Sequence, residues 1–232
     1  MLRTRDDLTV RSVLESSTLL NALTNEEMMT LAQHSRLVDV ERGETIWLQG
    51  EHPDFFGVGG LGFIKMARST SPGVESTLEI MGPGQVFGML SAIEGIGMPL
   101  SAYGLTNATY IRVPKLAFMP IYESSHLLKD RLIRRTSTRM HQKLDFMSRL
   151  SSGKAEERIA AILFILAETY GEPIERKIRI QIPLTRQEIG EMAGTTTETT
   201  IRVLSKWNKE GIVSTEQHIV TILQVSKLEA LL

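Results

Sequence analysis

Two helix-start signals lie close together near the C-terminal end of this 232-residue chain. The first is Thr185, which precedes RQEIGEMAG and has Glu188 three positions further on, the spacing of a capping box. The second is the threonine-rich run GTTTETTIRVL (194–204), which begins a helix that Gly211 ends. Only the tight turn at Gly194 separates the two, so the chain is constrained to a short helix, a turn and a second helix.

The segments on either side extend this unit into a compact domain. An apolar helix, AEERIAAILFILAETY, precedes it, with Gly171 as the expected C-cap. KIRIQIPL alternates apolar and polar residues, which is typical of a strand, and IVSTEQHIVTIL is typical of a two-stranded hairpin. The order helix, strand, helix, turn, helix, hairpin predicts a winged helix-turn-helix.

The threonine-rich helix has the residues that a DNA-reading helix needs at its N-terminal end. Such a helix inserts its first residues into the major groove, where hydroxyls such as those of Thr196 and Thr199 can donate to phosphates. Arginine reads guanine and glutamate accepts from cytosine, and Glu198 and Arg202 lie four positions apart on one face. An ordinary ion pair at a solvated helix end is the alternative, but the preceding helix and turn favour DNA binding. The side chains expected to face the domain are Ile201, Leu204 and Trp207.

The charge of this region sets a condition on DNA binding. Residues 154–232 hold ten Lys or Arg and eleven Asp or Glu, so the domain is not basic overall. Because phosphate neutralisation supplies much of the affinity for DNA, its cations must be clustered. The candidates for such a cluster are Arg186, Arg202, Lys206 and Lys209.

The N-terminal half has a different pattern. Residues 19–34 are expected to form a short helix, in which Thr24 and Glu27 make a capping box. From about residue 36 to residue 115, short β-prone runs such as DFFGVGGLGFIKMAR are separated by glycine and proline. The close spacing of these turn residues predicts a small antiparallel barrel or roll.

The segment between the two halves, IYESSHLLKDRLIRRTSTRMHQKLDFMSRLSS (121–152), contains no glycine and predicts one long helix. Ile133, Met140 and Met147 are seven positions apart, with Leu144 between the last two, which gives a heptad stripe. Packing of this stripe on the chain's own roll is one interpretation. The charges around the stripe favour the other, a symmetric dimer seam.

Composition excludes several other classes of protein. The chain has no cysteine, which rules out disulfides, thiolate zinc sites and cysteine nucleophiles. No apolar run approaches about 18 residues and the N-terminus lacks the apolar core of a signal peptide, so we expect a soluble cytoplasmic protein without a membrane partner. We find no catalytic motif, and the five histidines have no metal-ligand spacing. We therefore expect neither an enzyme nor a metal site.

The run LTRQEIGEMAGTTTETTIRVLSKWNKEGIV resembles the helix-turn-helix of the CRP/FNR superfamily, the cyclic AMP receptor protein and its relatives. The resemblance covers nearly the whole chain and implies an α+β fold in three parts. These are a cyclic-nucleotide-binding-like β-roll domain (1–122), a dimerisation helix and hinge (123–152) and a winged helix-turn-helix domain (153–232). It also implies a homodimeric transcription regulator that reads a palindromic DNA site with a TGA-like half-site core and works with RNA polymerase.

The resemblance also implies roles for residues of the reading helix. Glu198 and Arg202 match the carboxylate and the arginine that read the half-site core. Thr197 stands where the cyclic AMP receptor has a third base-reading arginine, which implies a different outer base pair. Arg186 and Thr196 match positions that contact phosphates. The complete expected DNA-binding set is Arg186, Thr196, Thr197, Glu198, Thr199, Arg202 and Lys206.

The segment GPGQVFGMLSAIEG resembles the family's phosphate cassette, but two residues differ from the cyclic-nucleotide-binding pattern. Met89 stands where the pattern has a glutamate for the ribose, and Leu100 precedes Ser101 where it has an arginine for the cyclic phosphate. Cyclic AMP bound in the usual way is not expected, because a buried phosphate would lose its charge-assisted pair. An apolar ligand, haem, or a pocket filled by its own side chains all stay open, and no cofactor is assigned. The expected effector-pocket residues are Gly88, Met89, Leu90, Leu100, Ser101, Lys143 and Leu144.

Two alternatives concern the histidines and the partner. His126 and His141 lie on or near the long helix, where a haem ligand is imaginable, although an exposed or hydrogen-bonded histidine is the favoured interpretation of each. The runner-up function is a cyclic-nucleotide-binding-like module that acts on a protein partner rather than on DNA. The changed cassette residues and the helix-turn-helix both argue against it.

Overall fold

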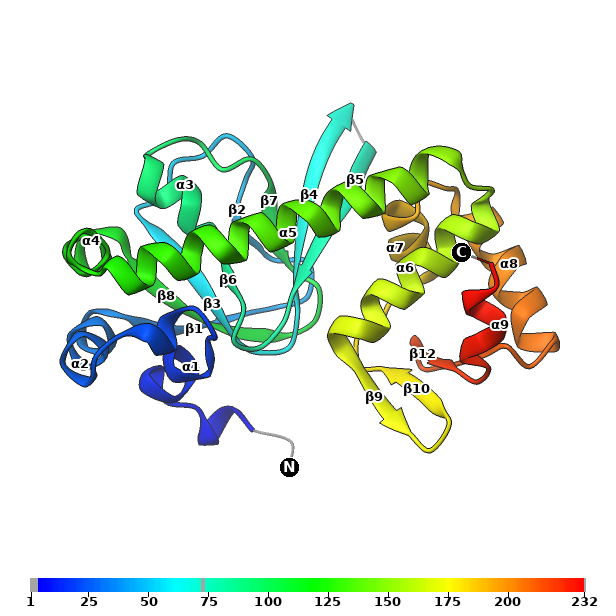
Figure 1. Ribbon diagram of the computed structural model, residues 1–232, viewed down its shortest axis with the longest axis horizontal. Coiled ribbons are helices and arrows are strands. Elements are labelled where there is room, and N and C mark those ends of the chain that lie inside the picture. The colour runs from blue at the N-terminus through cyan, green and yellow to red at the C-terminus, as the bar shows by residue number, and fades with distance from the viewer. Residues whose placement is uncertain (1–3, 72–73, 232) are drawn as a thin grey trace. The chain divides into compact units, whose positions relative to one another are not determined.

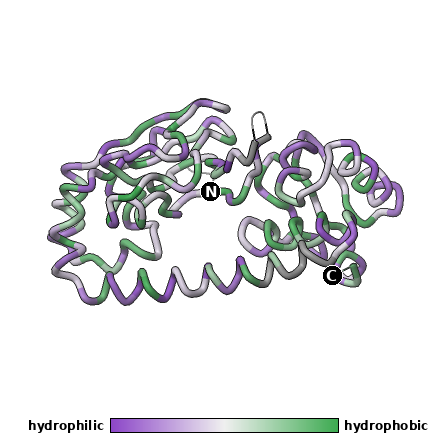
Figure 2. Tube along the Cα trace, turned by 90° about the horizontal axis from the view of Figure 1, so that it is seen from above, coloured by the Kyte–Doolittle hydropathy of each residue, from purple (hydrophilic) through white to green (hydrophobic). Residues whose placement is uncertain are grey.

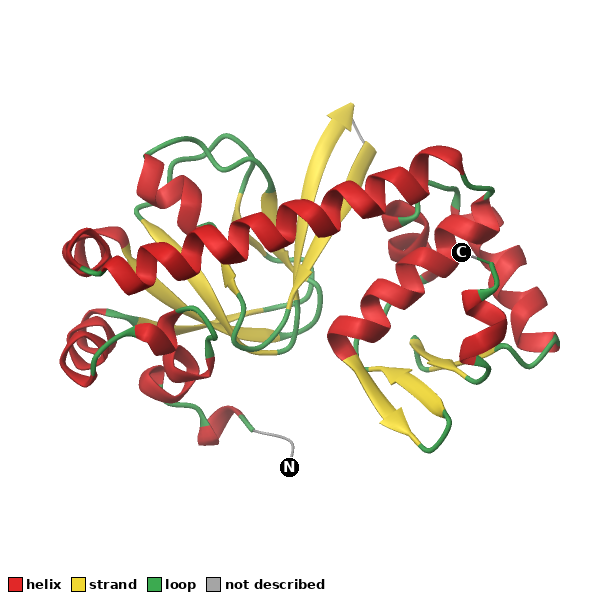
Figure 3. Cartoon of the chain, viewed as in Figure 1, coloured by secondary structure: helices red, strands yellow, loops and turns green. Residues whose placement is uncertain are grey.

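The computed structural model describes residues 4–71 and 74–231, and the chain forms two compact units, Met1–Arg139 and Met140–Leu232. The first unit contains a β-roll with short helices, and the second contains the helices and strands of the C-terminal region (Figure 1, Figure 3). The helix α5 (His126–Ser152) contributes residues to both units.

Two four-stranded antiparallel sheets form the β-roll, with strand orders β1-β8-β3-β6 and β2-β7-β4-β5. Gly43, Gly50, Gly62 and Gly84 lie between strands with positive φ, a backbone conformation that suits glycine. The roll expected from the glycine spacing is therefore confirmed. Its strands are β1 (Arg36–Val40), β2 (Thr45–Trp47), β3 (Phe55–Leu61), β4 (Ile64–Ser71), β5 (Val74–Met81), β6 (Val86–Phe87), β7 (Ser101–Gly104) and β8 (Ala108–Pro114).

Short helices cover the first of these sheets, and α1, α2 and α4 pack on its strand β8. Thr24 caps α2 as expected: its Oγ1 accepts a hydrogen bond from the Glu27 backbone N–H at 3.2 Å, and the Glu27 carboxylate accepts one from the Thr24 N–H at 2.8 Å. The helical segments before α5 are η1 (Arg5–Asp7), α1 (Val10–Ser16), η2 (Leu20–Ala22), α2 (Asn25–His34), α3 (Met89–Glu94) and α4 (Lys115–Ser124).

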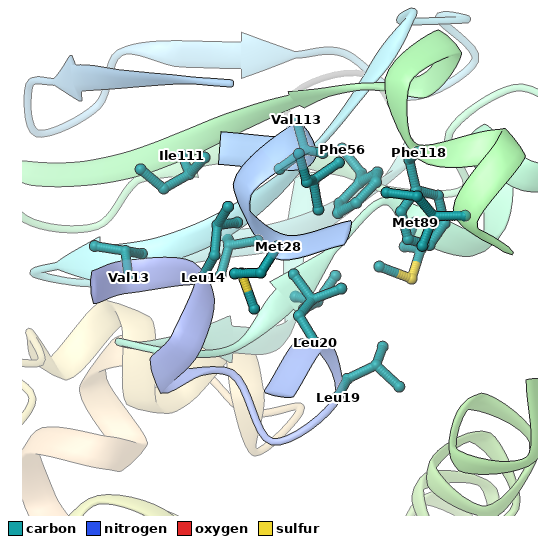
Figure 4. Close-up of a cluster of buried hydrophobic side chains, with 14 of the residues drawn as sticks. Val13, Leu14, Leu19, Leu20, Met28, Phe56, Met89, Ile111, Val113 and Phe118 are labelled. Atoms are coloured by element: carbon teal, nitrogen blue, oxygen red, sulfur yellow. The ribbon is translucent and has the colours of Figure 1, made fainter. Parts of the chain in front are cut away.

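The alternation of side chains along the strands divides the apolar residues of this unit between two cores. Phe55 and Tyr110 belong to the core between the two sheets, whereas their neighbours Phe56 and Ile111 belong to the core under the helices. Figure 4 shows the core under the helices, where side chains from α1, α2 and α4 meet those of β3 and β8. Both cores lie within the first unit.

The long helix begins five residues later than the sequence predicts, so the prediction of one unbroken helix over 121–152 is wrong. Helix α4 ends at Ser124, and Ser125 has extended backbone (φ −91°, ψ 102°). The Ser125 hydroxyl oxygen accepts a hydrogen bond from the Leu128 N–H at 3.3 Å, so this serine caps α5 instead of continuing α4. Hydrophobic and hydrophilic residues alternate along α5 (Figure 2).

The second unit has the element order of a winged helix-turn-helix, with one additional strand and one additional helix. Its sheet has the strand order β11-β12-β10-β9. The predicted hairpin is confirmed as β11 and β12, whereas β9 and α9 were not expected. The elements are α6 (Ala155–Tyr170), β9 (Gly171–Ile174), β10 (Lys177–Ile180), α7 (Arg186–Met192), α8 (Thr197–Lys209), β11 (Val213–Glu216), β12 (Ile219–Ile222) and α9 (Val225–Glu229).

Gly171 follows α6 as expected but does not have the left-handed conformation of a glycine C-cap. Its backbone is extended (φ −81°, ψ 134°) because it is already the first residue of β9. A glycine is required there for space, since a Cβ would lie 2.1 Å from the carbonyl oxygen of Ala167. Strand β9 also contains Pro173, which is tolerated because β9 is an edge strand.

Candidate DNA-binding site

Each of the helices α7 and α8 is capped by a threonine, and the cap of α7 is the one that the sequence predicts. Thr185 caps α7, with its Oγ1 accepting from the Glu188 N–H at 3.2 Å and the Glu188 carboxylate accepting from the Thr185 N–H at 2.7 Å. Thr196 caps α8 in the same way, because its Oγ1 accepts from the Thr199 N–H at 3.2 Å. Gly194, in the turn between them, has a φ of +59°. The turn and both helix starts therefore follow from local sequence.

Close packing fixes how α7 and α8 meet. A Cβ on Gly190 would lie 2.9 Å from the Thr200 hydroxyl oxygen and 3.1 Å from the Thr195 carbonyl oxygen. The Thr200 hydroxyl donates to the Thr196 carbonyl oxygen at 3.0 Å, so its polar group is satisfied although the residue is fully buried. A glycine on α7 and a self-satisfied threonine on α8 let the two helices approach closely.

The buried face of α8 differs from the predicted one at one position. Leu204 and Trp207 are buried as expected, each 1% exposed, but Ile201 is 47% exposed. At 100° per residue, Thr200 rather than Ile201 shares a face with Leu204 and Trp207. The expectation that Ile201 faces the domain is therefore wrong, and Ile201 borders the solvent face that carries Arg202.

The exposed face of α8 carries Glu198 and Arg202 at its N-terminal end. Within the described part of the chain, these two side chains form no salt bridge with each other or with any other residue. Hydrogen bonds from its own backbone N–H and from the Thr196 hydroxyl hold the pKa of Glu198 below its ordinary value, so the carboxylate is charged at neutral pH. The Glu198 carboxylate, as an acceptor, and the Arg202 guanidinium, as a donor, are thus exposed to a ligand.

Arg186, the first residue of α7, has an unsatisfied donor. Its Nη1 atom is buried and has no hydrogen-bond partner among the residues that the structure describes. Burial lowers the pKa of this guanidinium, which indicates that it is partly desolvated without a counter-charge. A phosphate near this half-buried guanidinium would supply the missing charge.

Other expected contact residues have more ordinary surroundings. Lys206 is exposed and its Nζ lies 3.1 Å from a carboxylate oxygen of Glu156 on α6, so its charge is already partly compensated. Thr197 and Thr199 are half-buried at the start of α8. Thr196 is exposed and acts as the cap.

Arg158 is a residue of this site that the sequence analysis missed. It lies on α6, and its guanidinium donates from Nε to the Ala193 carbonyl oxygen at 3.0 Å and from Nη2 to the Gly194 carbonyl oxygen at 3.1 Å. These bonds hold the turn between α7 and α8 from outside. Because the bonded positions are 35 and 36 residues away, no local pattern identifies the role.

The residues expected to form an effector pocket have different surroundings within their own units. Met89 is 3% exposed, but it packs in the core under the helices, next to Phe118 in Figure 4, and not between the sheets. Met89 therefore belongs to the core under the helices, and its expected place in an effector pocket stays a prediction. Leu90 is 44% exposed. Lys143 and Leu144 are exposed residues of the second unit.

Leu100, Ser101 and Gly88 do border the space between the two sheets, but their neighbours occupy it. The Trp47 Nε1–H donates to the Leu100 carbonyl oxygen at 3.0 Å, and the Ser101 hydroxyl oxygen accepts from the Gln49 N–H at 2.9 Å. A Cβ on Gly88 would lie 2.9 Å from the Trp47 ring. The polar groups of this segment are therefore used within the protein.

Aromatic rings fill the space between the two sheets. Trp47 lies with its ring centroid 5.5 Å from that of Phe55 and 5.3 Å from that of Phe87, and Phe87 lies 5.8 Å from Tyr110. All four residues are buried in one core. This packing matches one of the three alternatives left open by the sequence, a pocket filled by its own side chains.

Comparison with known protein families decides the identity of these two units. The family described as the Crp-like helix-turn-helix domain matches residues 157–231, and the family described as the cyclic nucleotide-binding domain matches residues 37–125. The chain belongs to the CRP/FNR superfamily. It is a DNA-binding transcription regulator of that superfamily, which consists of transcription regulators and not of enzymes.

Individual CRP/FNR proteins match most of the chain at modest identity. The CRP-like cAMP-activated global transcriptional regulator of Mycobacterium tuberculosis is 26% identical over 198 residues, covering 85% of this chain and 88% of that protein. The transcriptional activator protein anr of Pseudomonas aeruginosa is 28% identical over 212 residues, covering 90% and 86%. These relatives span both units.

Solved structures share the fold. FixK2 from Bradyrhizobium japonicum has a TM-score of 0.75 at 21% identity and covers 85% of this chain and 96% of its own. A CRP-family regulator from Thermus thermophilus has a TM-score of 0.68 at 24% identity and covers 84% and 95%. No helix in the described ranges, 4–71 and 74–231, is both long and apolar enough to cross a membrane.

Proposed function

We propose that this regulator is a cytoplasmic homodimer that reads a palindromic DNA site with a TGA-like half-site core. The observation that carries the proposal is the exposed N-terminal face of α8, where Glu198 and Arg202 have no salt-bridge partner among the described residues. The G·C pair of such a core offers guanine O6 and N7 to Arg202 and the cytosine N4 amino group to Glu198. The two side chains are complementary to that base pair.

Phosphate contacts would orient α8 in the groove. Arg186 is a half-buried cation at the start of α7, and Thr196 stands exposed at the positive end of the α8 dipole. Thr199 and Lys206 complete the proposed phosphate contacts. Thr197 is too short to serve as the third base-reading arginine of the cyclic AMP receptor, so we propose a weaker preference at the outer base pair.

The heptad stripe of α5 supports the homodimer. Ile133, Met140, Leu144 and Met147 are 55–67% exposed in the single chain. Four large apolar side chains along one line of a helix are stabilised by pairing with the same line of a second copy. A symmetric pair would hold two α8 helices for half-sites one helical turn apart, about 34 Å.

We further propose that cyclic AMP does not control this regulator through the usual cassette. Leu100 stands in place of the arginine for the cyclic phosphate, and Trp47 and Phe87 occupy the space between the sheets. A buried phosphate without a cationic partner is strongly disfavoured. Control would then come from another effector or from none, with RNA polymerase as the partner at the promoter. The alternative role on a protein partner alone is not favoured, because the chain has a complete helix-turn-helix.

The experiment compares two labelled DNA duplexes by fluorescence anisotropy. One carries two TGA-core half-sites in two-fold arrangement, and the other has the same composition with both cores scrambled. We expect the palindrome to bind at least about 1,000-fold more tightly at physiological salt. Equal affinities for the two duplexes, with or without cyclic AMP, would refute the proposed DNA site.

A further inference from the structure

A hollow lies on the first unit outside both sheets of the roll. It is lined by Thr18 and Leu19, which precede η2, and by three arginines of α5, Arg131, Arg134 and Arg135. We call it the arginine hollow. Its volume is about 270 Å³, which suits a small ligand of a few groups better than a drug-sized molecule.

The positive charge of the arginine hollow is not neutralised by ion pairs of the described residues. The three arginines occupy positions i, i+3 and i+4 of one helix, where like charges repel each other. In residues 4–71 and 74–231, no carboxylate forms a salt bridge with Arg131, Arg134 or Arg135. The α5 helix therefore concentrates three guanidiniums at one place on the surface.

The hydrogen bonds that the structure gives these arginines go to neutral oxygens. Nη1 of Arg131 donates to the Thr18 carbonyl oxygen at 3.4 Å and to the side-chain oxygen of Asn21. Nη1 of Arg135 donates to the Thr18 hydroxyl oxygen at 3.5 Å. All three bonds use Nη1 atoms, so the other N–H donors of these guanidiniums are unused in the bonds that the structure gives for the hollow.

Arg135 adds a second observation that points to an anion. The residue is half-buried, and burial lowers the pKa of its guanidinium. A cation that is partly removed from water without an opposite charge is destabilising, and a bound anion would remove that penalty.

We propose that the arginine hollow binds a small anion that carries a phosphoryl group. The planar guanidinium fork matches phosphate oxygens in pairs, and a phosphoryl group brings up to two charges and three terminal oxygens. A single carboxylate offers two oxygens and one charge, which leaves part of three guanidiniums unpaired. Arg131, Arg134 and Arg135 would donate to the anion, and the Thr18 hydroxyl lies at the edge of the same hollow.

The site is separate from the surfaces used in the proposed function. At 100° per residue, Arg131 and Arg135 lie about 160° and Arg134 about 100° around α5 from Ile133, so pairing through the heptad stripe leaves the hollow open. None of its residues belongs to α8 or to the space between the sheets. Failure of this proposal would leave the DNA-reading proposal intact.

The test is calorimetry of the full chain with inorganic phosphate and pyrophosphate, at constant ionic strength held with sodium chloride. We expect saturable binding that is tighter for pyrophosphate. Arg134→Gln changes an exposed arginine and should weaken it by roughly tenfold or more. Arg134→Lys, which keeps the charge but not the fork, should lose less affinity.

Two matched controls make the same change of charge elsewhere. Arg68→Gln alters an exposed arginine of β4 and Arg36→Gln alters an exposed arginine of β1, and both should leave pyrophosphate affinity unchanged. The proposal is overturned if the wild-type protein shows no saturable heat at tens of millimolar pyrophosphate, or if either control weakens binding as much as Arg134→Gln. Citrate binding as tightly as pyrophosphate, with the same sensitivity to Arg134→Gln, would overturn the phosphoryl assignment.

Discussion

The exposed face of α8 and the interior of the β-roll use their polar groups in opposite ways. On α8, Glu198 and Arg202 are exposed and have no salt-bridge partner among the described residues. In the roll, the Trp47 Nε1–H is bonded to the Leu100 carbonyl oxygen, and Ser101 is bonded to a backbone N–H. One region keeps its donors and acceptors available for a ligand, and the other satisfies them internally.

The fold of the roll is kept although large side chains fill the space between its two sheets. The roll keeps two sheets of four strands and matches the cyclic nucleotide-binding domain family. Its interior nevertheless holds the rings of Trp47, Phe55, Phe87 and Tyr110, which are all buried in one core. Large rings can replace a ligand in stabilising two facing sheets.

The largest expected effect concerns dimerisation through α5, which would place two α8 helices on the two half-sites of a palindrome. Met140→Glu together with Leu144→Glu would place four carboxylates in the apolar seam of the dimer. We expect a loss of about 5 kcal/mol or more of dimerisation free energy, because unpaired charges would be buried. Analytical ultracentrifugation at micromolar protein should then show monomers.

The matched control for that experiment uses the opposite face of α5. Thr138→Glu together with Gln142→Glu adds the same charges at the same spacing on exposed residues outside the stripe. This variant should remain dimeric. A dimer that persists in the Met140→Glu, Leu144→Glu protein would show that the seam lies elsewhere.

The next effect concerns the packed interior of the β-roll. Trp47→Ala removes a ring that is 2% exposed at the centre of the roll and should lower the free energy of unfolding by about 3–5 kcal/mol. Urea unfolding followed by circular dichroism measures it. Leu78→Ala, at a 48% exposed position of β5, is the control and should change little.

The same variant sharpens the assignment of the roll's interior. If Trp47 fills ligand space, added indole should stabilise Trp47→Ala and leave the wild-type protein unaffected. A loss below about 1 kcal/mol for Trp47→Ala would mean that the interior is loosely packed, and the roll could then no longer be regarded as closed by its own side chains.

A smaller effect concerns the exposed face of α8. Arg202→Ala should weaken binding to a cognate palindrome by about 1–3 kcal/mol and relax the preference at one guanine. Lys206→Ala should weaken all DNA sequences alike, and only slightly, because Lys206 is already paired with Glu156. Anisotropy titrations on cognate and scrambled duplexes measure both. An unchanged ratio of specific to scrambled affinity in Arg202→Ala would place the reading residues elsewhere.

The smallest effect tests which side of α8 is buried. Ile201→Ala should change the free energy of unfolding by no more than about 0.5 kcal/mol, as expected of an exposed position. Leu204→Ala, at a 1% exposed position, should cost about 2–5 kcal/mol. Thermal unfolding of the two variants compares them. Similar losses in both would restore the view that Ile201 faces the domain.

Local patterns predicted much of this protein correctly. The capping boxes at Thr24 and Thr185 and the turn at Gly194 depend on residues within a few positions of each other. The roll also followed from the spacing of its turn glycines. Features of this kind do not depend on tertiary contacts, so they can be predicted from the sequence alone.

The features that the sequence did not predict depend on side-chain hydrogen bonds to the backbone or on contacts between distant positions. Thr200 is buried and Ile201 exposed because a hydrogen bond to the Thr196 carbonyl oxygen satisfies the threonine hydroxyl, which hides its polarity. Ser125 ends one helix and caps the next. The bond from Trp47 to Leu100 joins positions 53 residues apart, and that from Arg158 to Ala193 joins positions 35 apart. No local sequence pattern contains both partners of such a hydrogen bond.

Selection from a random double-stranded DNA library, with and without cyclic AMP, tests the central claim most directly. The central claim is that α8 reads DNA through Glu198 and Arg202 while the roll stays closed to cyclic AMP. We predict that the full chain enriches the same two-fold sequences with TGA-like cores under both conditions. Enrichment only in the presence of cyclic AMP, or a consensus without a two-fold TGA-like core, would contradict it.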